Sequence, residues 1–205
     1  ISHGARYGLD GFALEWLGGA ATYRESFDRI FAACEHWNAN KPAWATSNFS
    51  LIPIIDNGDW AGMASQVALH INSSCMYRVG GRPFISSWGF SGLQWSNETQ
   101  VKQHIEDYSK VFVPAIKATG FAPDGPFYLP SMYPPNFNAP ADLIDQQLIL
   151  ELFPELDGLW TWGCGDTGDV VANASIATVQ ACDAAKKYAA GPISAPYSPH
   201  RSADL

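Results

Sequence analysis

Three acidic residues follow apolar segments of the chain, at points where a strand is expected to end. Glu15 comes after the letters GFAL, Asp56 after LIPII, and Asp166 after GLWTWGCG. Hydrolysis of a glycosidic bond needs two carboxyl groups, one that protonates the leaving oxygen and one that acts as base or nucleophile. Because parallel strands bring their carboxyl ends to one rim, we expect Glu15, Asp56 and Asp166 to converge there as catalytic residues.

Aromatic and amide side chains accompany these acids along the chain. Aromatic rings stack on the C–H faces of sugars, and amides and phenols hydrogen-bond to sugar hydroxyl groups. We therefore expect these side chains to bind a polysaccharide or oligosaccharide. The predicted substrate-binding residues are Trp16, Asn57, Trp88, Tyr133, Trp162 and Tyr197.

Each acid also has a plainer interpretation. Asp10 and Asp157 stand at strand starts, where we expect their carboxylates to accept hydrogen bonds from backbone N–H groups. Asp56 lies in an Asp-Asn-Gly turn, and Asp166 lies in a glycine-rich loop where a solvated carboxylate is ordinary. Glu15 ends an apolar strand, where an acid is costly unless it is paired or functional. For the three site acids both interpretations stay open.

Metal and serine-triad chemistry find no support in the sequence. The five histidines show no metal-ligand spacing, and only His200 falls near the expected rim. The chain has no G-x-S-x-G motif for a serine nucleophile and no C-x-x-C pair for a zinc ribbon. We therefore predict neither a metal nor a cofactor.

The bulk composition is that of a globular protein. The chain has 205 residues, of which 47% are hydrophobic and 16% charged, which argues against disorder. The net charge of -8 argues against nucleic-acid binding, because a duplex binder needs a basic surface. No apolar run approaches the roughly 20 residues that span a bilayer, so we predict no membrane partner.

Cysteines and glycosylation sequons predict a secreted glycoprotein. The chain has four N-x-S/T sequons, at Asn48, Asn72, Asn97 and Asn173, and an even number of cysteines. We expect Cys34 to pair with Cys75, since both lie on consecutive outer helices. We expect Cys164 to pair with Cys182, since a strand-end loop can reach the following helix. The alternative is four buried free thiols in a cytosolic protein.

Apolar segments alternate with helical patterns along the whole chain. We expect strands near residues 9–15, 50–55, 83–87, 126–130, 156–162 and 192–196, and helices near 1–7, 24–37, 60–71, 98–118, 141–152 and 174–188. This alternation predicts an α/β protein with a parallel sheet, either an open doubly wound sheet or a closed barrel. No G-x-G-x-x-G motif or P-loop follows a strand, which favours the barrel.

We expect residues 1–205 to form a single, incomplete (β/α)8 barrel domain of the TIM type. A complete barrel takes roughly 250 residues, whereas about six strand-helix units are visible in this chain. The chain also begins on a helix end and stops after its last expected strand. We therefore expect it to be a fragment, with the missing remainder of the barrel as a possible partner.

Four phrases resemble glycoside hydrolase family 71, the fungal endo-1,3-alpha-glucanases or mutanases. They are GLDGFAL at 8–14, GRPFISSWG at 81–89, DGLWTW at 157–162 and SAPYSP at 194–199, in the family's order. The resemblance implies a (β/α)8 barrel and endo-hydrolysis of alpha-1,3-glucan by a secreted fungal enzyme. Family 99, the endo-alpha-mannosidase-like barrels, is the next closest comparison.

The chain departs from the family pattern at the acids. Glu15 stands where family members usually have Asn, and Gly163 stands where they usually have Asp. The family's W-N-D-Y-G-E segment, which carries its acid pair, has no counterpart here. The alternative function is therefore a carbohydrate-binding, lectin-like protein on a degenerate glycosidase barrel. A nucleotide-binding open sheet is a third, weaker option.

Overall fold

A mainly parallel sheet runs through the middle of the molecule. The computed structural model describes residues 1–56, 58–87, 98–132, 146–161 and 168–190. Its strands are β1 (Gly11–Trp16), β2 (Ser50–Ile55), β3 (Arg78–Val79), β4 (Arg82–Ser87), β5 (Phe127–Met132), β6 (Gly158–Thr161) and β7 (Tyr188–Ala190). The order is β1-β2-β4-β5-β6-β7, and all these neighbours pair in parallel. The predicted α/β class and the order of the first five predicted strands are confirmed.

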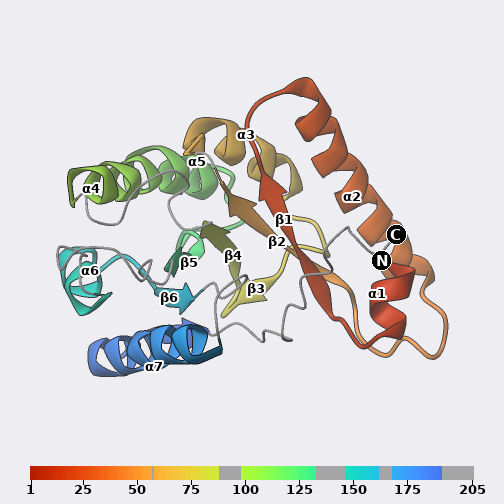
Figure 1. Ribbon diagram of the computed structural model, residues 1–205. Helices are drawn as coiled ribbons and strands as arrows, with labels where there is room; N and C mark the ends of the chain where they lie inside the picture. Colours follow the sequence, from red (N-terminus) through yellow and green to blue (C-terminus); the bar gives the residue numbers. More distant parts are fainter. Residues whose placement is uncertain (57, 88–97, 133–145, 162–167, 191–205) are drawn as a thin grey trace, which may run out of the picture.

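Helices alternate with these strands and form an arc along one side of the sheet (Figure 1). They are α1 (Ser2–Arg6), α2 (Ala21–Asn40), α3 (Trp60–His70), α4 (Glu98–Asp107), α5 (Val113–Ala118), α6 (Gln146–Leu152) and α7 (Gly168–Ala185). A π-helical turn, Tyr108–Phe112, joins α4 to α5 within the single helix predicted over 98–118. Pro114 follows two residues after the end of this turn. In a regular α-helix the ring of Pro114 would clash with the carbonyl of Lys110, and the wider π-helical turn relieves that clash.

The end of the described chain differs from the prediction. The helix expected over 174–188 ends at Ala185, because Lys186 adopts a left-handed conformation with φ 55. The N–H of Lys187 then donates to the carbonyl of Cys182 at 2.8 Å, which closes the helix end, and the chain enters β7. The strand predicted at 192–196 lies outside the described residues.

The two faces of the sheet have different surroundings. Alternate strand residues on the helix side are at most 1% exposed and join one apolar core with the helices: Leu51, Ile55, Ile85, Tyr128 and Leu159. The opposite side, here called the inner face, carries Ala13, Glu15, Ile54, Ser86 and Trp160. Ala13 and Glu15 on the edge strand β1 are exposed, so the inner face is open there.

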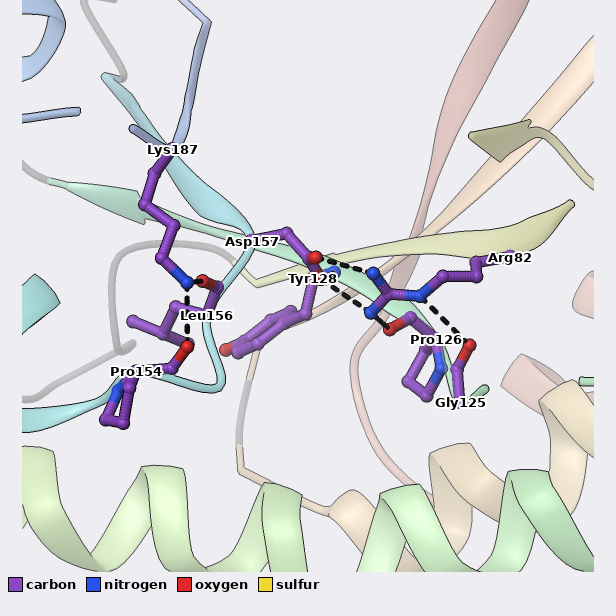
Figure 2. A network of polar contacts seen from close by, with 8 residues as sticks. All are labelled: Arg82, Gly125, Pro126, Tyr128, Pro154, Leu156, Asp157 and Lys187. Atoms are coloured by element: carbon purple, nitrogen blue, oxygen red, sulfur yellow. Dashed lines mark hydrogen bonds and ion pairs between the residues drawn. The ribbon is translucent and has the colours of Figure 1, made fainter. Parts of the chain in front are cut away.

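An ion pair fastens the amino ends of three strands (Figure 2). The guanidinium of Arg82 on β4 binds both oxygens of Asp157, which directly precedes β6, at 2.6 and 2.8 Å. It also donates to the carbonyl oxygens of Gly125 and Pro126, just before β5. Asp157 in turn accepts the backbone N–H of Tyr128 at 2.9 Å. The structural role predicted for Asp157 is therefore confirmed.

The sheet is open within the described residues. Its edge strands, β1 and β7, do not pair with each other there. The short strand β3 runs antiparallel to β4 and forms a hairpin through Gly80 and Gly81, which both have positive φ. No helix in the described part of the chain is long and apolar enough to cross a membrane.

Three of the four cysteines lie within the described residues. Cys34 on α2, Cys75 after α3 and Cys182 on α7 are buried free thiols. Cys34 and Cys75 both lie within reach of the side-chain amide of Asn38, and their predicted pairing stays a prediction. Cys164, the predicted partner of Cys182, lies outside the described residues.

The sequons occupy different kinds of position. Asn48 and Asn72 are exposed, and Asn48 accepts a hydrogen bond from the ammonium of Lys41 at 2.7 Å. Asn173 lies in α7, and Asn97 lies outside the described residues. Glycosylation stays a prediction at all four.

Candidate active site at the carboxyl ends of the strands

Glu15 and Asp56 lie at the carboxyl ends of the neighbouring strands β1 and β2. Glu15 pairs in register with Ile54, and Asp56 follows Ile54 by two residues, so both acids belong to the inner face. The backbone N–H of Asp56 donates to the carbonyl of Trp16 at 3.1 Å, which carries the strand pairing on to Asp56. The structure therefore brings together two of the three predicted catalytic acids.

The surroundings of this pair raise the pKa of Glu15. Partial burial raises the pKa of Glu15 above its ordinary value, and the negative charge of Asp56 raises it further. Glu15 consequently retains its proton to a higher pH than a free glutamate does. A raised carboxyl pKa beside a second carboxylate is a feature that known general acids share.

Trp16 occupies a different place from the one predicted. It is 0% exposed and points to the helix side of β1, because neighbouring strand residues face opposite ways and Glu15 takes the inner face. Its ring packs edge-on against Phe27 with centroids 5.8 Å apart. Trp16 is thus a core residue here, and its position gives no support to the predicted stacking on a sugar.

Asp59 was missed by the sequence analysis, although it ties β1 to α3. It caps the helix by accepting the N–H of Gly62 at 3.0 Å and also accepts the indole N–H of Trp16 at 3.2 Å. A side chain at position 62 would place its Cβ 2.1 Å from the Asp59 carboxylate, so any residue other than glycine would displace the cap. The Asn-Gly-Asp sequence before an apolar helix pattern was the available signal for this cap.

Trp160 is an aromatic residue of the inner face that the sequence analysis also missed. Its indole N–H donates to the hydroxyl of Ser86 at 2.7 Å, and Ser86 donates to the carbonyl of Leu129 at 2.7 Å. Three strands thereby fix the orientation of a partly buried indole ring. Ser131 pairs in register with Trp160, and its buried hydroxyl has no hydrogen-bond partner among the described residues.

A second polar group lies behind the rim, on the helix side of the sheet. The hydroxyl of Ser87, the last residue of β4, lies 2.9 Å from that of Tyr128, and the Nε2 atom of His104 lies 3.3 Å from the same hydroxyl. Burial lowers the pKa of His104 from 6.5 to about 3, so its imidazole is neutral at pH 7. This group holds the carboxyl end of β4 against α4 and is too buried to meet a substrate.

A pocket of ≈ 200 Å³ lies at the opposite, amino-terminal end of the strands. Arg82, Gly125 and Pro126 contribute to its wall beside the π-helical turn. The charge of Arg82 is already balanced by Asp157. Asp124 also lines this pocket, and it therefore provides an exposed acid remote from Glu15.

Several predicted site residues lie outside the part of the chain that the structure describes. They are Asn57, Trp88, Tyr133, Trp162, Asp166 and Tyr197. Asp10 accepts a hydrogen bond from the Ser47 hydroxyl at 2.8 Å, so its contact is with a side chain and not with the backbone N–H groups that were expected. Among the described residues, no group of three or more histidine, cysteine or acidic side chains could hold a metal ion.

Comparison with known proteins adds no relative. No protein-family model, curated protein or solved structure matches the chain. A function for this molecule therefore has to be proposed from its own residues.

Proposed function

We propose that the protein is a glycoside hydrolase that cleaves an alpha-glucan, with alpha-1,3-glucan as the first candidate substrate. The observation that carries this proposal is the pair of carboxyl groups, Glu15 and Asp56, at the carboxyl ends of adjacent parallel strands. Glycosidases of most families act through such a pair.

The raised pKa of Glu15 assigns the roles within the pair. Glu15 donates its proton to the glycosidic oxygen as the bond to the anomeric carbon breaks. Asp56 in its ionised form either takes a proton from the attacking water or attacks the anomeric carbon itself. Asp166 stays a third candidate for either role, because its segment also follows a strand end.

The order of the strands supports a barrel as the complete architecture. β1, β2, β4, β5 and β6 are parallel neighbours in chain order, as in the first part of a (β/α)8 barrel. In such a barrel the inner face would line the interior, and its carboxyl-terminal rim would hold the acids. The four phrases that resemble family 71 support the same architecture and the choice of substrate.

Secretion belongs to the same proposal. The exposed sequons at Asn48 and Asn72 are accessible acceptor sites for a glycan, as a secreted glycoprotein requires. An extracellular or cell-wall location would also place the enzyme beside its polysaccharide substrate.

The test is amide substitution of each acid, with glucan turnover and glucan binding measured separately. We expect Glu15→Gln and Asp56→Asn to lower kcat by about 10²- to 10⁴-fold while glucan binding stays close to that of the parent. Asp166→Asn shows whether the third acid belongs to the site. Asp124→Asn is the matched control, because Asp124 is an exposed acid at the opposite end of the strands.

Two results would contradict the proposal. Turnover unchanged in Glu15→Gln and Asp56→Asn would remove both as catalysts. A parent protein that binds glucan without hydrolysing it would favour the lectin-like alternative, which rests on the missing W-N-D-Y-G-E segment.

A further inference from the structure

Two thiols from distant parts of the sequence meet inside the core. Cys34 on α2 and Cys75 after α3 are each 0% exposed, and the thiol of Cys34 donates to the carbonyl of Phe49 at 3.3 Å. The side-chain amide of Asn38 bridges them, with Nδ2 at 3.2 Å from the sulfur of Cys75 and 4.0 Å from that of Cys34. The two sulfurs are therefore neighbours in a site that solvent does not reach.

Further hydrogen bonds join the segments around the two thiols. Asn38 accepts the N–H of Phe49 at 2.7 Å and donates to its carbonyl at 2.9 Å. The N–H of Leu51 donates to the carbonyl of Cys75 at 2.7 Å, and that of Tyr77 donates to the carbonyl of Leu51 at 3.0 Å. A reagent can reach the thiols only if β2 separates from α2 or from the segment around Cys75.

We propose that Cys34 and Cys75 join in a disulfide while the chain folds, before the core closes, and that the finished fold then shields the pair from thiol exchange. This inference is independent of the proposed catalytic activity. The sequence predicts the pairing, and the structure indicates when the bond can form. The pair is accordingly a structural cross-link made once and not a reversible switch.

The chemistry explains why timing matters. One thiol loses its proton, and the thiolate attacks a small disulfide such as glutathione disulfide, which forms a mixed disulfide and releases one glutathione thiolate. The second cysteine thiolate then displaces the other glutathione, so two protons go to solvent and two electrons go to glutathione. Both steps need a thiolate in contact with the reagent. Burial, followed by the neighbouring Cys75, raises the pKa of Cys34, which makes that thiolate scarce in the folded state.

The cross-link would also stabilise the fold. It closes a loop that contains β2 and α3, and a loop of this length removes much of the freedom of the unfolded chain. We expect the oxidised protein to melt roughly 10 °C above the reduced one.

The experiment compares oxidation during folding with oxidation after folding. The full chain with Cys164→Ser and Cys182→Ser keeps only the pair. One reduced sample is refolded from urea with glutathione disulfide, and another receives the same reagent when already folded; intact mass and thiol titration follow the bond. We expect the folded sample to react at least about 100-fold more slowly, and its rate to rise with urea in proportion to global opening.

Variants keep each outcome interpretable. Asn38→Ala retains both thiols but loosens their enclosure, so its folded form should oxidise faster than the parent. Cys75→Ser should show no change in Tm with glutathione disulfide. If the double serine background does not fold, peptide mapping of the natural sequence after the two treatments gives the same comparison.

Two results would overturn the proposal. Equal oxidation rates in the folded and unfolded protein would make the pair an exchangeable switch. Refolding that leaves both thiols free, or that joins either to another cysteine, would show that the two do not form the cross-link.

Discussion

His104 is a buried base at the boundary between α4 and the sheet. Its contacts include the hydroxyl of Tyr128 at 3.3 Å and the ring of Trp60, with centroids 5.0 Å apart. Burial accordingly lowers its pKa from 6.5 to about 3. The stability of the fold therefore depends on pH, because His104 binds a proton in the unfolded chain at a pH where it stays neutral in the folded chain.

We predict that the free energy of unfolding falls as the pH drops below 6.5. Between pH 6.5 and about 3 the unfolded chain carries a proton on His104 that the folded chain does not, so acid favours unfolding. The slope should approach 1.4 kcal/mol per pH unit, to about 5 kcal/mol in total. Urea unfolding at several pH values measures it.

His104→Gln should lose most of this slope, whereas the exposed control His3→Gln should keep it. A parent protein whose stability is unchanged from pH 6.5 to 4 would contradict the prediction.

Glu15 allows a direct test of the coupling between the two site acids. Its pKa is raised by partial burial and by the charge of Asp56. Carboxyl-carbon NMR titration should therefore give Glu15 a pKa above the ordinary 4.5, and Asp56→Asn should lower it without restoring the ordinary value fully, since the burial remains. An unchanged Glu15 pKa in Asp56→Asn would show that the two acids do not interact. Asp124→Asn is again the control.

At the scale of elements, the Arg82–Asp157 pair connects the amino ends of three neighbouring strands. Both side chains are mostly withdrawn from solvent, with 29% and 16% of their surfaces exposed. Asp157 also receives the N–H of Tyr128, and the N–H of Tyr188 on β7 donates to its carbonyl at 2.9 Å. Positions in four strands therefore depend on one short segment around Asp157.

We predict that Asp157→Ala destabilises the protein by about 3 kcal/mol, because it leaves a guanidinium and a backbone N–H without their partner. Arg29→Ala should cost less than about 1 kcal/mol, because its ion pair with Glu25 is exposed. Urea unfolding of both variants gives the comparison. Equal losses in the two would show that the buried pair has no special role.

At the scale of the whole molecule, the sequence predicts the strand order well but the short elements poorly. The strands near Leu51, Ile85 and Leu159 stand out because each is an apolar run with clear boundaries. The helix predicted over 174–188 included Tyr188, the first residue of β7, because Lys186 is not a residue type that signals a left-handed turn, and no strand was predicted at Ala189 and Ala190. A local sequence pattern does not show where tertiary contacts outweigh the helix propensity of a segment.

The candidate site, too, could be predicted from the sequence only in part. Glu15 and Asp56 could be placed together because both follow strand ends, and parallel strands end at one rim. Trp16 was misplaced because a single residue step along a strand reverses the face. The contact of Trp160 with Ser86 joins residues 74 positions apart, and no spacing rule in one sequence reveals such a pair.

The Arg82–Asp157 contact also constrains how this chain can change over generations. Loss of Arg82 leaves the carboxylate of Asp157 without its cation, and loss of Asp157 leaves the guanidinium and the N–H of Tyr128 without that acceptor. Each single substitution therefore gives a less stable protein. We expect substitutions at the two positions to occur together in evolution, or not to occur. In a set of related sequences the pair would stand out as covariation between positions 75 residues apart.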